Sequence, residues 1–500
     1  MTVCVVAGLA RQAEQQPNRP AIIAPNLTLT WGELGDTAAR IAALLKHRDV
    51  GRGQVVAINS NYSPAMEATL IAAVWWVGGA TAVFTDQQWN DLPFTPDFTL
   101  CPSATSKHAG TKIVIDTATL DRLGGWQAAA PASHHDDDVL HIVFSSGTTG
   151  RPNPVVFPAV TQHRRAYATE LPYMTTVGPT GYSWFAGLLF SLREGEPLHL
   201  PGNTAETLQV LRKHRVRSLS ATPAQVAALC DLAERTHTSP SGLRTVLAAG
   251  AAWPDTLVAR IRKTLGAKTI NLYAGTEMAG VATDPHPDCA SNRVGTPLPG
   301  VTVEIVDDTH QPVAEGETGR IRVHNPGFPT YYYGPDPNLW DDGAGYRDGW
   351  FYPGDLGYLQ DGQLFVRGRI NDVINAAGVK VYPADVERVI ASQPGVKDVA
   401  CAQYTRADGL TAAGVLVVPD PDMLGGQPDP DSPRFDLDKV RRATARTLGE
   451  MTPELWLVSN HIPRNTNGKI DRAGVTSLLE QPQDVGGNPY RTSRPSERNP

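Results

Sequence analysis

A run of hydroxyl residues and glycines follows the apolar strand predicted over residues 139–144. The run is Ser145-Ser146-Gly147-Thr148-Thr149-Gly150-Arg151-Pro152. Small residues let the backbone bend so that several N–H groups converge on a phosphate, and the hydroxyls add further donors. Because the run lacks the G-K-[ST] ending of a Walker loop, it does not predict a P-loop NTPase. Taken alone, it predicts either a phosphate-binding loop or a polar surface turn.

A second segment, after a predicted strand, combines an aromatic ring, a hydroxyl and a carboxylate. It is Asn271-Leu272-Tyr273-Ala274-Gly275-Thr276-Glu277. Such groups are suited to stacking on a base, bonding a phosphate and holding Mg²⁺. Further loops present charged groups, and they are Tyr352-Pro353-Gly354-Asp355, Gly368-Arg369-Ile370-Asn371-Asp372 and Pro463-Arg464-Asn465-Thr466-Asn467-Gly468-Lys469-Ile470-Asp471-Arg472. Each of these segments, considered singly, is more often an ordinary loop.

The elements that must position these segments are predicted from apolar periodicity and turn residues. Up to about residue 340, strands and helices alternate as in a layered α/β domain, and after residue 295 short strands indicate a β-rich subdomain. Residues 370–480 are predicted to form a compact α+β unit. The predicted elements include strands 217–220, 244–248, 371–374, 397–403 and 412–418, and helices 204–213, 383–392 and 437–448.

Together, the segments resemble the motifs of the adenylate-forming enzyme superfamily, which includes acyl-CoA synthetases, adenylation domains and luciferases. The Ser/Thr/Gly loop, Y-G-x-T-E, [YR]-x-G-D, G-R-x-[DK] and P-x-[TN]-x-x-G-K-[ILV]-x-R elements occur in the family's order, and the resemblance covers residues 5–480. It implies a large α/β N-terminal domain with a β subdomain over residues 1–369. We also expect a small mobile α+β lid over residues 370–480 and a disordered tail over residues 481–500.

The resemblance also implies the chemistry. A carboxylate attacks the α-phosphate of ATP and expels pyrophosphate, so the site needs positive charge, aligned donors and Mg²⁺. Lys469 would bridge the carboxylate and the α-phosphate, Thr276 would reach that phosphate, and Glu277 would bind Mg²⁺. The residues implied to bind ATP or AMP are Ser145, Ser146, Gly147, Thr148, Thr149, Gly150, Gly250, Ala251, Ala252, Asn271, Tyr273, Ala274, Gly275, Asp355 and Arg369.

Within that set, the resemblance implies distinct roles. Thr148 and Thr149 would hold the β- and γ-phosphates, while Tyr273 would stack on adenine beside Asn271 and the Gly250-Ala251-Ala252 turn. Asp355 would accept hydrogen bonds from the ribose hydroxyls, with Arg369 close by.

A hinge is implied at Asn371, where the family usually has Asp or Lys. Rotation of the lid there would withdraw Lys469 and bring the loop of Gly378 to the adenylate for the second step. Asn tolerates unusual backbone angles and can therefore serve as a hinge.

The sequence departs from the family pattern in two places. Asn153 and Pro154 stand where the phosphate loop usually has Lys and Gly, which removes one cation near pyrophosphate. The segment that usually lines the acyl pocket is Tyr182-Ser183-Trp184-Phe185-Ala186-Gly187, and it has no histidine. Trp184, Phe185 and Gly187 are accordingly predicted to line a pocket for an aromatic or flat acid. A strand in the protein core is the alternative for Trp184 and Phe185.

Composition excludes several other classes of function. The net charge of −7 gives no basic footprint for nucleic acid or an anionic membrane. The five cysteines are scattered, which predicts neither a disulfide framework nor a zinc site. The apolar stretch 68–84 is interrupted by Gly78 and Gly79 and predicts a buried helix followed by a strand. No signal peptide is recognisable, so the expected location is cytoplasmic.

The predicted substrates are ATP with Mg²⁺, a small carboxylic acid and an acceptor of the acyl group. The thiol of CoA is the favoured acceptor, because Ala377-Gly378-Val379-Lys380-Val381-Tyr382-Pro383 resembles the lid of acyl-CoA ligases. An amine, giving an amide, and a separate carrier protein are the alternatives. A non-catalytic nucleotide sensor is a further alternative, and the joint presence of Glu277, Asp355 and Lys469 argues against it.

Overall fold

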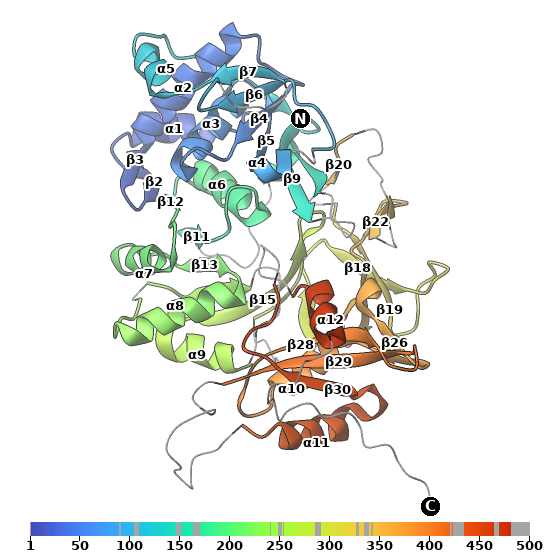
Figure 1. The fold of residues 1–500 in the computed structure, drawn as a ribbon. Coiled ribbons are helices and arrows are strands. Elements are labelled where there is room, and N and C mark those ends of the chain that lie inside the picture. Colours follow the sequence, from blue (N-terminus) through green and yellow to red (C-terminus); the bar gives the residue numbers. More distant parts are fainter. Residues whose placement is uncertain are drawn as a thin grey trace, which may run out of the picture.

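The computed structural model describes most of the chain. The described residues are 2–89, 92–104, 110–146, 152–163, 171–240, 242–248, 253, 255–285, 292–326, 330–334, 340–341, 344–420, 423, 435–464 and 470–481. They form a mixed α/β structure with two large sheets, followed by a smaller group of strands and helices from the end of the chain (Figure 1). The predicted α/β fold class is therefore confirmed.

The first sheet is parallel at its centre and antiparallel at one edge. The strand order is β20-β10-β9-β5-β4-β6-β7, and β10 runs antiparallel to both of its neighbours, β9 and β20. The strands are β4 (Val55–Asn59), β5 (Ala80–Phe84), β6 (Phe98–Cys101), β7 (Thr111–Val114), β9 (Val139–Ser146), β10 (Pro152–Pro158) and β20 (Tyr331–Tyr332).

Helix α3 (Pro64–Trp76) connects β4 to β5 and is the buried helix predicted within residues 68–84. The hydroxyl of Ser63 caps its first turn by accepting the N–H of Met66. The helix packs against α2 (Trp31–His47), so its side chains are buried from Ala68 to Trp76. Gly78 then takes a φ of +84°, a left-handed conformation that glycine adopts without strain, and the chain turns into β5.

The second sheet has an antiparallel pair at one edge, β2 (Pro20–Ala24) and β3 (Leu27–Thr30), followed by a parallel part, and it becomes antiparallel again at β15 (Lys268–Gly275). Its parallel part contains β11 (Tyr173–Thr175), β12 (Leu198–His199), β13 (Ser218–Ala221) and β14 (Thr245–Ala248). The helices that alternate with them are α6 (Tyr182–Glu194), α7 (Thr204–Lys213), α8 (Pro223–Arg235) and α9 (Asp255–Leu265). Helix α7 has the predicted bounds 204–213.

Beyond β15 the second sheet continues as the predicted run of short strands. In chain order they are β16 (Ala279–Asp284), β17 (Arg293–Pro297), β18 (Thr302–Val306), β19 (Gly319–His324), β21 (Trp340–Asp341), β22 (Ala344–Arg347), β23 (Trp350–Tyr352), β24 (Asp355–Gln360) and β25 (Gln363–Arg369). The strand β15 therefore joins the α/β part of the molecule to its β-rich part.

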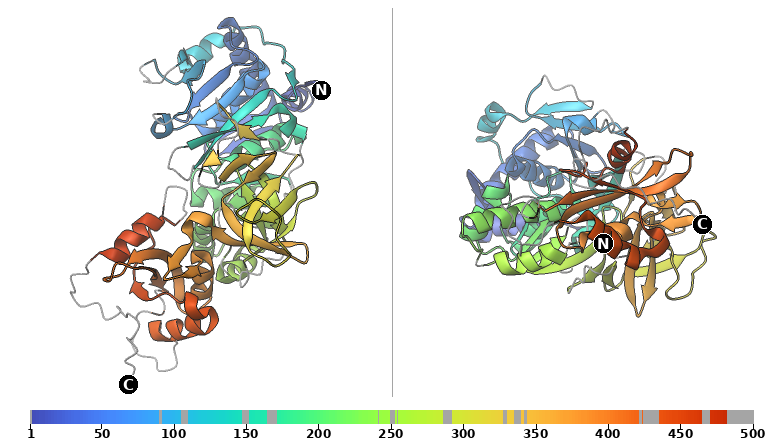
Figure 2. Two further views of the ribbon diagram at one scale, coloured as in Figure 1. Left: turned by 90° about the vertical axis from the view of Figure 1, so that its right-hand side faces the viewer. Right: turned by 60° about the horizontal axis from the view of Figure 1, so that its bottom comes forward.

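The C-terminal group contains a sheet in the order β28-β29-β30 and a short hairpin of β26 and β27. Its elements are β26 (Ile374–Ala376), β27 (Val379–Val381), α10 (Pro383–Ala391), β28 (Val396–Thr405), β29 (Thr411–Pro419), α11 (Leu437–Leu448), β30 (Leu455–Val458) and α12 (Arg472–Glu480). In Figure 2 this orange and red group lies at the opposite end of the molecule from the first sheet.

One predicted element of this group is wrong. Residues 371–374 were expected to be a strand, but Ile370–Asp372 form a 3₁₀ turn and β26 begins only at Ile374. The turn is held because the N–H of Ile370 bonds the carbonyl of Gly354, which anchors the chain to the loop before β24. Within the described residues, no helix is both long enough and apolar enough to cross a membrane.

Candidate active site

The first contact of the candidate site joins the hydroxyl-rich run to the second segment. Ser145 lies at the end of β9, and its Oγ donates a hydrogen bond of 2.5 Å to Oε1 of Glu277, which follows β15. The strands β9 and β10 form a hairpin on either side of the run, with Ser145 paired to Asn153. The structure therefore brings into contact two motifs that are 132 residues apart in sequence.

The second segment is a strand for most of its length, which corrects the prediction that it follows one. Residues 271–275 belong to β15 and pair with residues 279–284 of β16 in a tight hairpin. Because the ladder extends to Gly275, only Thr276, Glu277 and Met278 form the turn. The hairpin thus presents Thr276 and Glu277 at its tip and Tyr273 along its side.

Three hydroxyl residues that the sequence analysis missed surround Glu277. The hydroxyl of Tyr332 lies 3.4 Å from Glu277 Oε1. The backbone carbonyl of Glu277 accepts hydrogen bonds from Oγ1 of Thr330 and, at 2.9 Å, from the hydroxyl of Tyr346. Burial and the charge of Glu277 raise the pKa of Tyr332, so its hydroxyl remains a donor. Tyr332 belongs to β20, Tyr346 belongs to β22, and Thr330 directly precedes β20. No local sequence pattern connects these residues with Glu277.

The second cluster of the site is built around Asp355, at the start of β24. The hydroxyl of Tyr273 donates a 2.5 Å hydrogen bond to Asp355 Oδ2, and Arg369 Nε lies 3.0 Å from Oδ1. Arg369 is held in turn by the carbonyl of Pro353, 2.8 Å from its Nη1. Gly354 takes a φ of +76°, which turns the chain tightly into β24.

The electrostatics of this cluster follow from its burial. The side chain of Asp355 is only 9% exposed and faces the guanidinium of Arg369. The charge of the Asp355 carboxylate raises the pKa of Arg369. Burial, and to a lesser extent the charge of Asp355, raise the pKa of Tyr273. A neutral tyrosine and a charged arginine thus hold the carboxylate in place. Asn271 lies on the same strand as Tyr273 and is buried, with Nδ2 3.5 Å from the carbonyl of Arg293.

The predicted hinge and second-step loop lie at the start of the C-terminal group. Asn371 is exposed in the 3₁₀ turn Ile370–Asp372. Gly378 lies between β26 and β27 with a φ of +92°, and its N–H bonds Oδ1 of Asn375 at 3.0 Å. Across the turn, Arg367 of β25 contacts Asp385 of α10 at 2.8 Å.

The residues predicted to line the acyl pocket lie in a helix rather than the strand considered as their alternative. Trp184 and Phe185 belong to α6 and are each 1% exposed. The ring of Phe185 stacks on His141 at 4.6 Å and lies 5.1 Å from Phe157. Trp184 and Phe185 are both members of the main apolar core, which favours the interpretation that they are core residues over the interpretation that they line a pocket. Gly187 allows a close approach, because a Cβ there would lie 3.0 Å from the ring of Tyr173.

Several predicted residues lie outside the described part of the chain. Only the backbone of Ser146 is described, within β9. The others are Gly147, Thr148, Thr149, Gly150, Gly250, Ala251, Ala252 and Lys469, together with the predicted tail from residue 482 onward. The metal role of Glu277 is compatible with its carboxylate and the hydroxyl donors around it.

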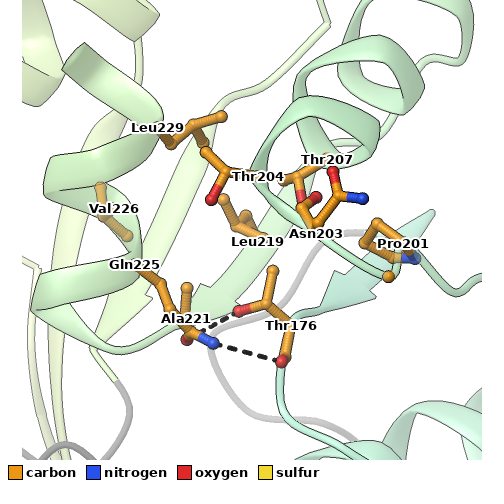
Figure 3. Close-up of a pocket in the computed structure, with 11 residues that line it drawn as sticks. Thr176, Pro201, Asn203, Thr204, Thr207, Leu219, Ala221, Gln225, Val226 and Leu229 are labelled. Carbon is orange, nitrogen blue, oxygen red and sulfur yellow. Dashed lines mark hydrogen bonds between the residues drawn. The ribbon is translucent and has the colours of Figure 1, made fainter. Parts of the chain in front are cut away.

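A cavity of about 120 Å³ lies elsewhere, between the start of α7 and the start of α8 (Figure 3). One wall is closed by a hydrogen bond of 2.9 Å from Thr176 Oγ1 to Gln225 Oε1. Its other lining residues are Pro201, Gly202, Asn203, Thr204, Thr207, Leu219, Ala221, Val226 and Leu229. None of the predicted site residues contributes to this lining, so the cavity is not assigned to the reaction.

Comparison with known proteins decides the family. The sequence profile of a family described as "AMP-binding enzyme" matches residues 9–91 and 77–333. The chain belongs to this family. AMP-binding enzymes of this kind are adenylate-forming ligases, and the predicted family and enzyme class are confirmed.

Several relatives are similar to this chain along almost its whole length. Novobiocin biosynthesis protein H of Streptomyces niveus is 28% identical over 96% of this chain and 83% of its own length. The 2-succinylbenzoate–CoA ligase of Bacillus subtilis is 26% identical over 93% of this chain and 96% of its own. The solved structure of the Bacillus subtilis o-succinylbenzoate–CoA synthetase with ATP and magnesium shares the fold, with a TM-score of 0.74 and 24% identity over 93% of this chain and 98% of that one.

Proposed function

We propose that the protein activates an aromatic or otherwise flat carboxylic acid as its acyl-adenylate, using ATP and Mg²⁺, and transfers the acyl group to the thiol of CoA. One observation carries the proposal. The Ser145–Glu277 contact lies at the tip of the β15 hairpin, and the Tyr273–Asp355–Arg369 cluster lies along the same strand. A single strand would thus hold the phosphate end and the ribose end of one nucleotide.

The residues of this chain would divide the work of the first step. Asp355 accepts hydrogen bonds from the ribose hydroxyls, and its orientation is set by Tyr273 and Arg369. Glu277 and the hydroxyl-rich run hold the metal and the phosphates. A carboxylate oxygen of the acid forms a bond to the α-phosphorus, and the bond to the pyrophosphate oxygen breaks. Lys469 lowers the charge repulsion as this happens.

The aromatic acid is supported by relatives rather than by the described pocket. The name of the 2-succinylbenzoate–CoA ligase identifies an aromatic acid, and this relative aligns with nearly the whole chain. Trp184 and Phe185 add no support for an aromatic acid, since both pack in the core.

The second step is proposed to use the residues after 369 as a lid that turns at Asn371. Residues 1–369 and 370–480 are thus proposed as the two domains. The hairpin of Gly378 would then face the adenylate, and the thiol sulfur of CoA would attack its carbonyl carbon, releasing AMP. Loading of a separate carrier protein and aminolysis share this first step and remain the alternative second steps.

Acid-dependent exchange of labelled pyrophosphate into ATP tests the first step. A panel of benzoate, cinnamate and aliphatic acids should give exchange that is greatest with a flat aromatic acid. The best acid is then supplied with CoA or with a panel of amines at matched concentration, and acyl-CoA should form faster than any amide. Exchange that no acid stimulates would contradict adenylation itself. Rapid amide formation without acyl-CoA would leave the adenylation step intact and would show that the acceptor is an amine rather than CoA.

A further inference from the structure

The pairing of β9, β10 and β20 brings three polar side chains onto one face of the first sheet. Asn153 of β10 pairs with Ser145 of β9, and Val155 of β10 pairs with Tyr332 of β20. Paired residues of an antiparallel ladder point to the same face, as do residues two apart on one strand. Ser145, Asn153 and Tyr332 therefore share a face, and the side chain of Asn153 lies close enough to the Tyr332 hydroxyl to lower its pKa.

One oxygen of the Glu277 carboxylate, Oε1, contacts the hydroxyl groups on this face of the sheet. Oε1 lies 2.5 Å from the Ser145 hydroxyl and 3.4 Å from the Tyr332 hydroxyl. Tyr332 is only 6% exposed, and its ring packs edge-on against Tyr346 with centroids 5.2 Å apart. The Tyr346 hydroxyl bonds the backbone carbonyl of the same Glu277 at 2.9 Å. Both the backbone and the side chain of Glu277 are thus fixed by groups of β20 and β22.

We propose that Tyr332 is a positioning residue for the metal–nucleotide complex. Its hydroxyl and that of Ser145 engage Oε1 of Glu277, so that Oε2 is directed toward the divalent cation that accompanies ATP. This inference rests on the proposed function, in which Glu277 binds that cation. Hydrogen bonds to one carboxylate oxygen orient the other as a ligand, and such outer contacts commonly tune metal affinity.

Asn153 fits the same arrangement. It occupies the position where the family usually has a lysine, and its side chain lies near enough to the Tyr332 hydroxyl to lower its pKa. A neutral amide supports that hydroxyl without placing a second cation beside Glu277. The replacement of the family's lysine by Asn153 and the placement of Tyr332 therefore both serve to position Glu277.

The test measures binding of Mn²⁺·ATP to the full chain by electron paramagnetic resonance, with Mn²⁺ as the probe. Tyr332→Phe removes only the hydroxyl and should weaken the binding about three- to tenfold, whereas ATP binding in excess chelator stays unchanged. Tyr331→Phe is the matched control, because Tyr331 pairs with Val156 and points to the other face. Asn153→Ala should weaken the binding in the same direction by a smaller factor, and it carries the test if Tyr332→Phe does not fold.

Two results are adverse, and they have different meanings. Mn²⁺·ATP binding by Tyr332→Phe that equals that of Tyr331→Phe overturns the positioning role. Glu277→Gln binding Mn²⁺·ATP as tightly as the unaltered protein overturns the metal role of Glu277 in the proposed function. Weaker binding in Glu277→Gln and Tyr332→Phe, with Tyr331→Phe unchanged, supports the inference.

Discussion

At the scale of single residues, the candidate site depends on two carboxylates whose positions are set by neighbouring donors. Glu277 is held by hydroxyls, and Asp355 is held by a phenol and a guanidinium. The difference suits their proposed partners. A carboxylate with hydroxyl neighbours keeps its full negative charge for a cation, whereas one paired with Arg369 is suited to accept hydrogen bonds from neutral ribose hydroxyls.

Lys469→Ala should lower acid-dependent pyrophosphate exchange about a hundredfold to a thousandfold, because its charge is needed chiefly as the transition state forms. Binding of ATP, measured by calorimetry, should change little. Transfer from a chemically synthesised adenylate supplied to the variant serves as the control and should stay close to that of the unaltered protein. Equal losses in exchange and transfer would contradict a role confined to the first step.

A second residue prediction concerns His141, which is buried beneath Phe185 with its Nδ1 2.7 Å from Oγ1 of Thr81. Burial lowers the pKa of His141 to about 3. Unfolding restores the ordinary value near 6.5, so between pH 6.5 and about 3 the unfolded chain binds a proton that the folded chain does not. Acidification through this window therefore favours unfolding, by up to about 1.4 kcal/mol for each pH unit.

Urea unfolding at pH 7 and pH 5 checks this prediction. His141→Gln removes the titrating ring and should show a smaller fall in the free energy of unfolding between the two pH values than the unaltered protein shows. His461→Gln, at an exposed position, is the control. An equal fall in His141→Gln and His461→Gln would show that the buried imidazole does not contribute.

At the scale of elements, the contact between β25 and α10 spans the proposed hinge. Arg367 lies before Asn371, while Asp385 and Tyr382 lie after it. The guanidinium of Arg367 bonds Asp385 at 2.8 Å and lies 4.1 Å from the centroid of the Tyr382 ring. Asp385 is buried, so the pair is better shielded from solvent than a surface ion pair. A lid that turns at Asn371 has to change this contact.

Arg367→Ala should therefore alter the balance of the two steps, changing the ratio of their single-turnover rates about two- to fivefold. Arg388→Ala is the matched control, because Arg388 contacts the same Asp385 at 3.5 Å from within α10 and does not span the hinge. Quenched-flow measurement of adenylate and acyl-CoA gives both rates. A ratio that changes equally in both variants would place the effect in α10 rather than at the hinge.

The elements were more predictable than their contacts. Helices α7 and α11 have the predicted bounds because each begins at a capping residue, Asn203 and Asp436 respectively, and carries a helical apolar pattern. A core strand is the alternative for Trp184 and Phe185 in the sequence, because a short apolar stretch does not distinguish a strand from a buried helix. Tyr332 could not be predicted, since β20 reaches β10 from far along the chain and no local pattern records that pairing.

At the scale of the whole molecule, the site lies where the two large sheets meet. The first sheet contributes Ser145, and the second contributes Tyr273 and Glu277 at β15 and Asp355 and Arg369 from its β-rich part. The C-terminal group joins this assembly at β25 and the turn after it (Figure 1). Such an arrangement can present a fixed nucleotide site to a lid that turns, which is what a two-step ligase requires.

The central claim is that a carboxylate oxygen of the substrate becomes bonded to the α-phosphorus of ATP. Its most direct test supplies the best acid with both carboxylate oxygens labelled with ¹⁸O, together with ATP, Mg²⁺ and CoA, and analyses the nucleotide product by mass spectrometry. Adenylation followed by attack at the carbonyl carbon leaves one labelled oxygen on AMP, so the account predicts singly labelled AMP in step with product formation. Label found in inorganic phosphate, accompanied by ADP, would contradict the account, because it would mean that the acid attacks the γ-phosphate instead.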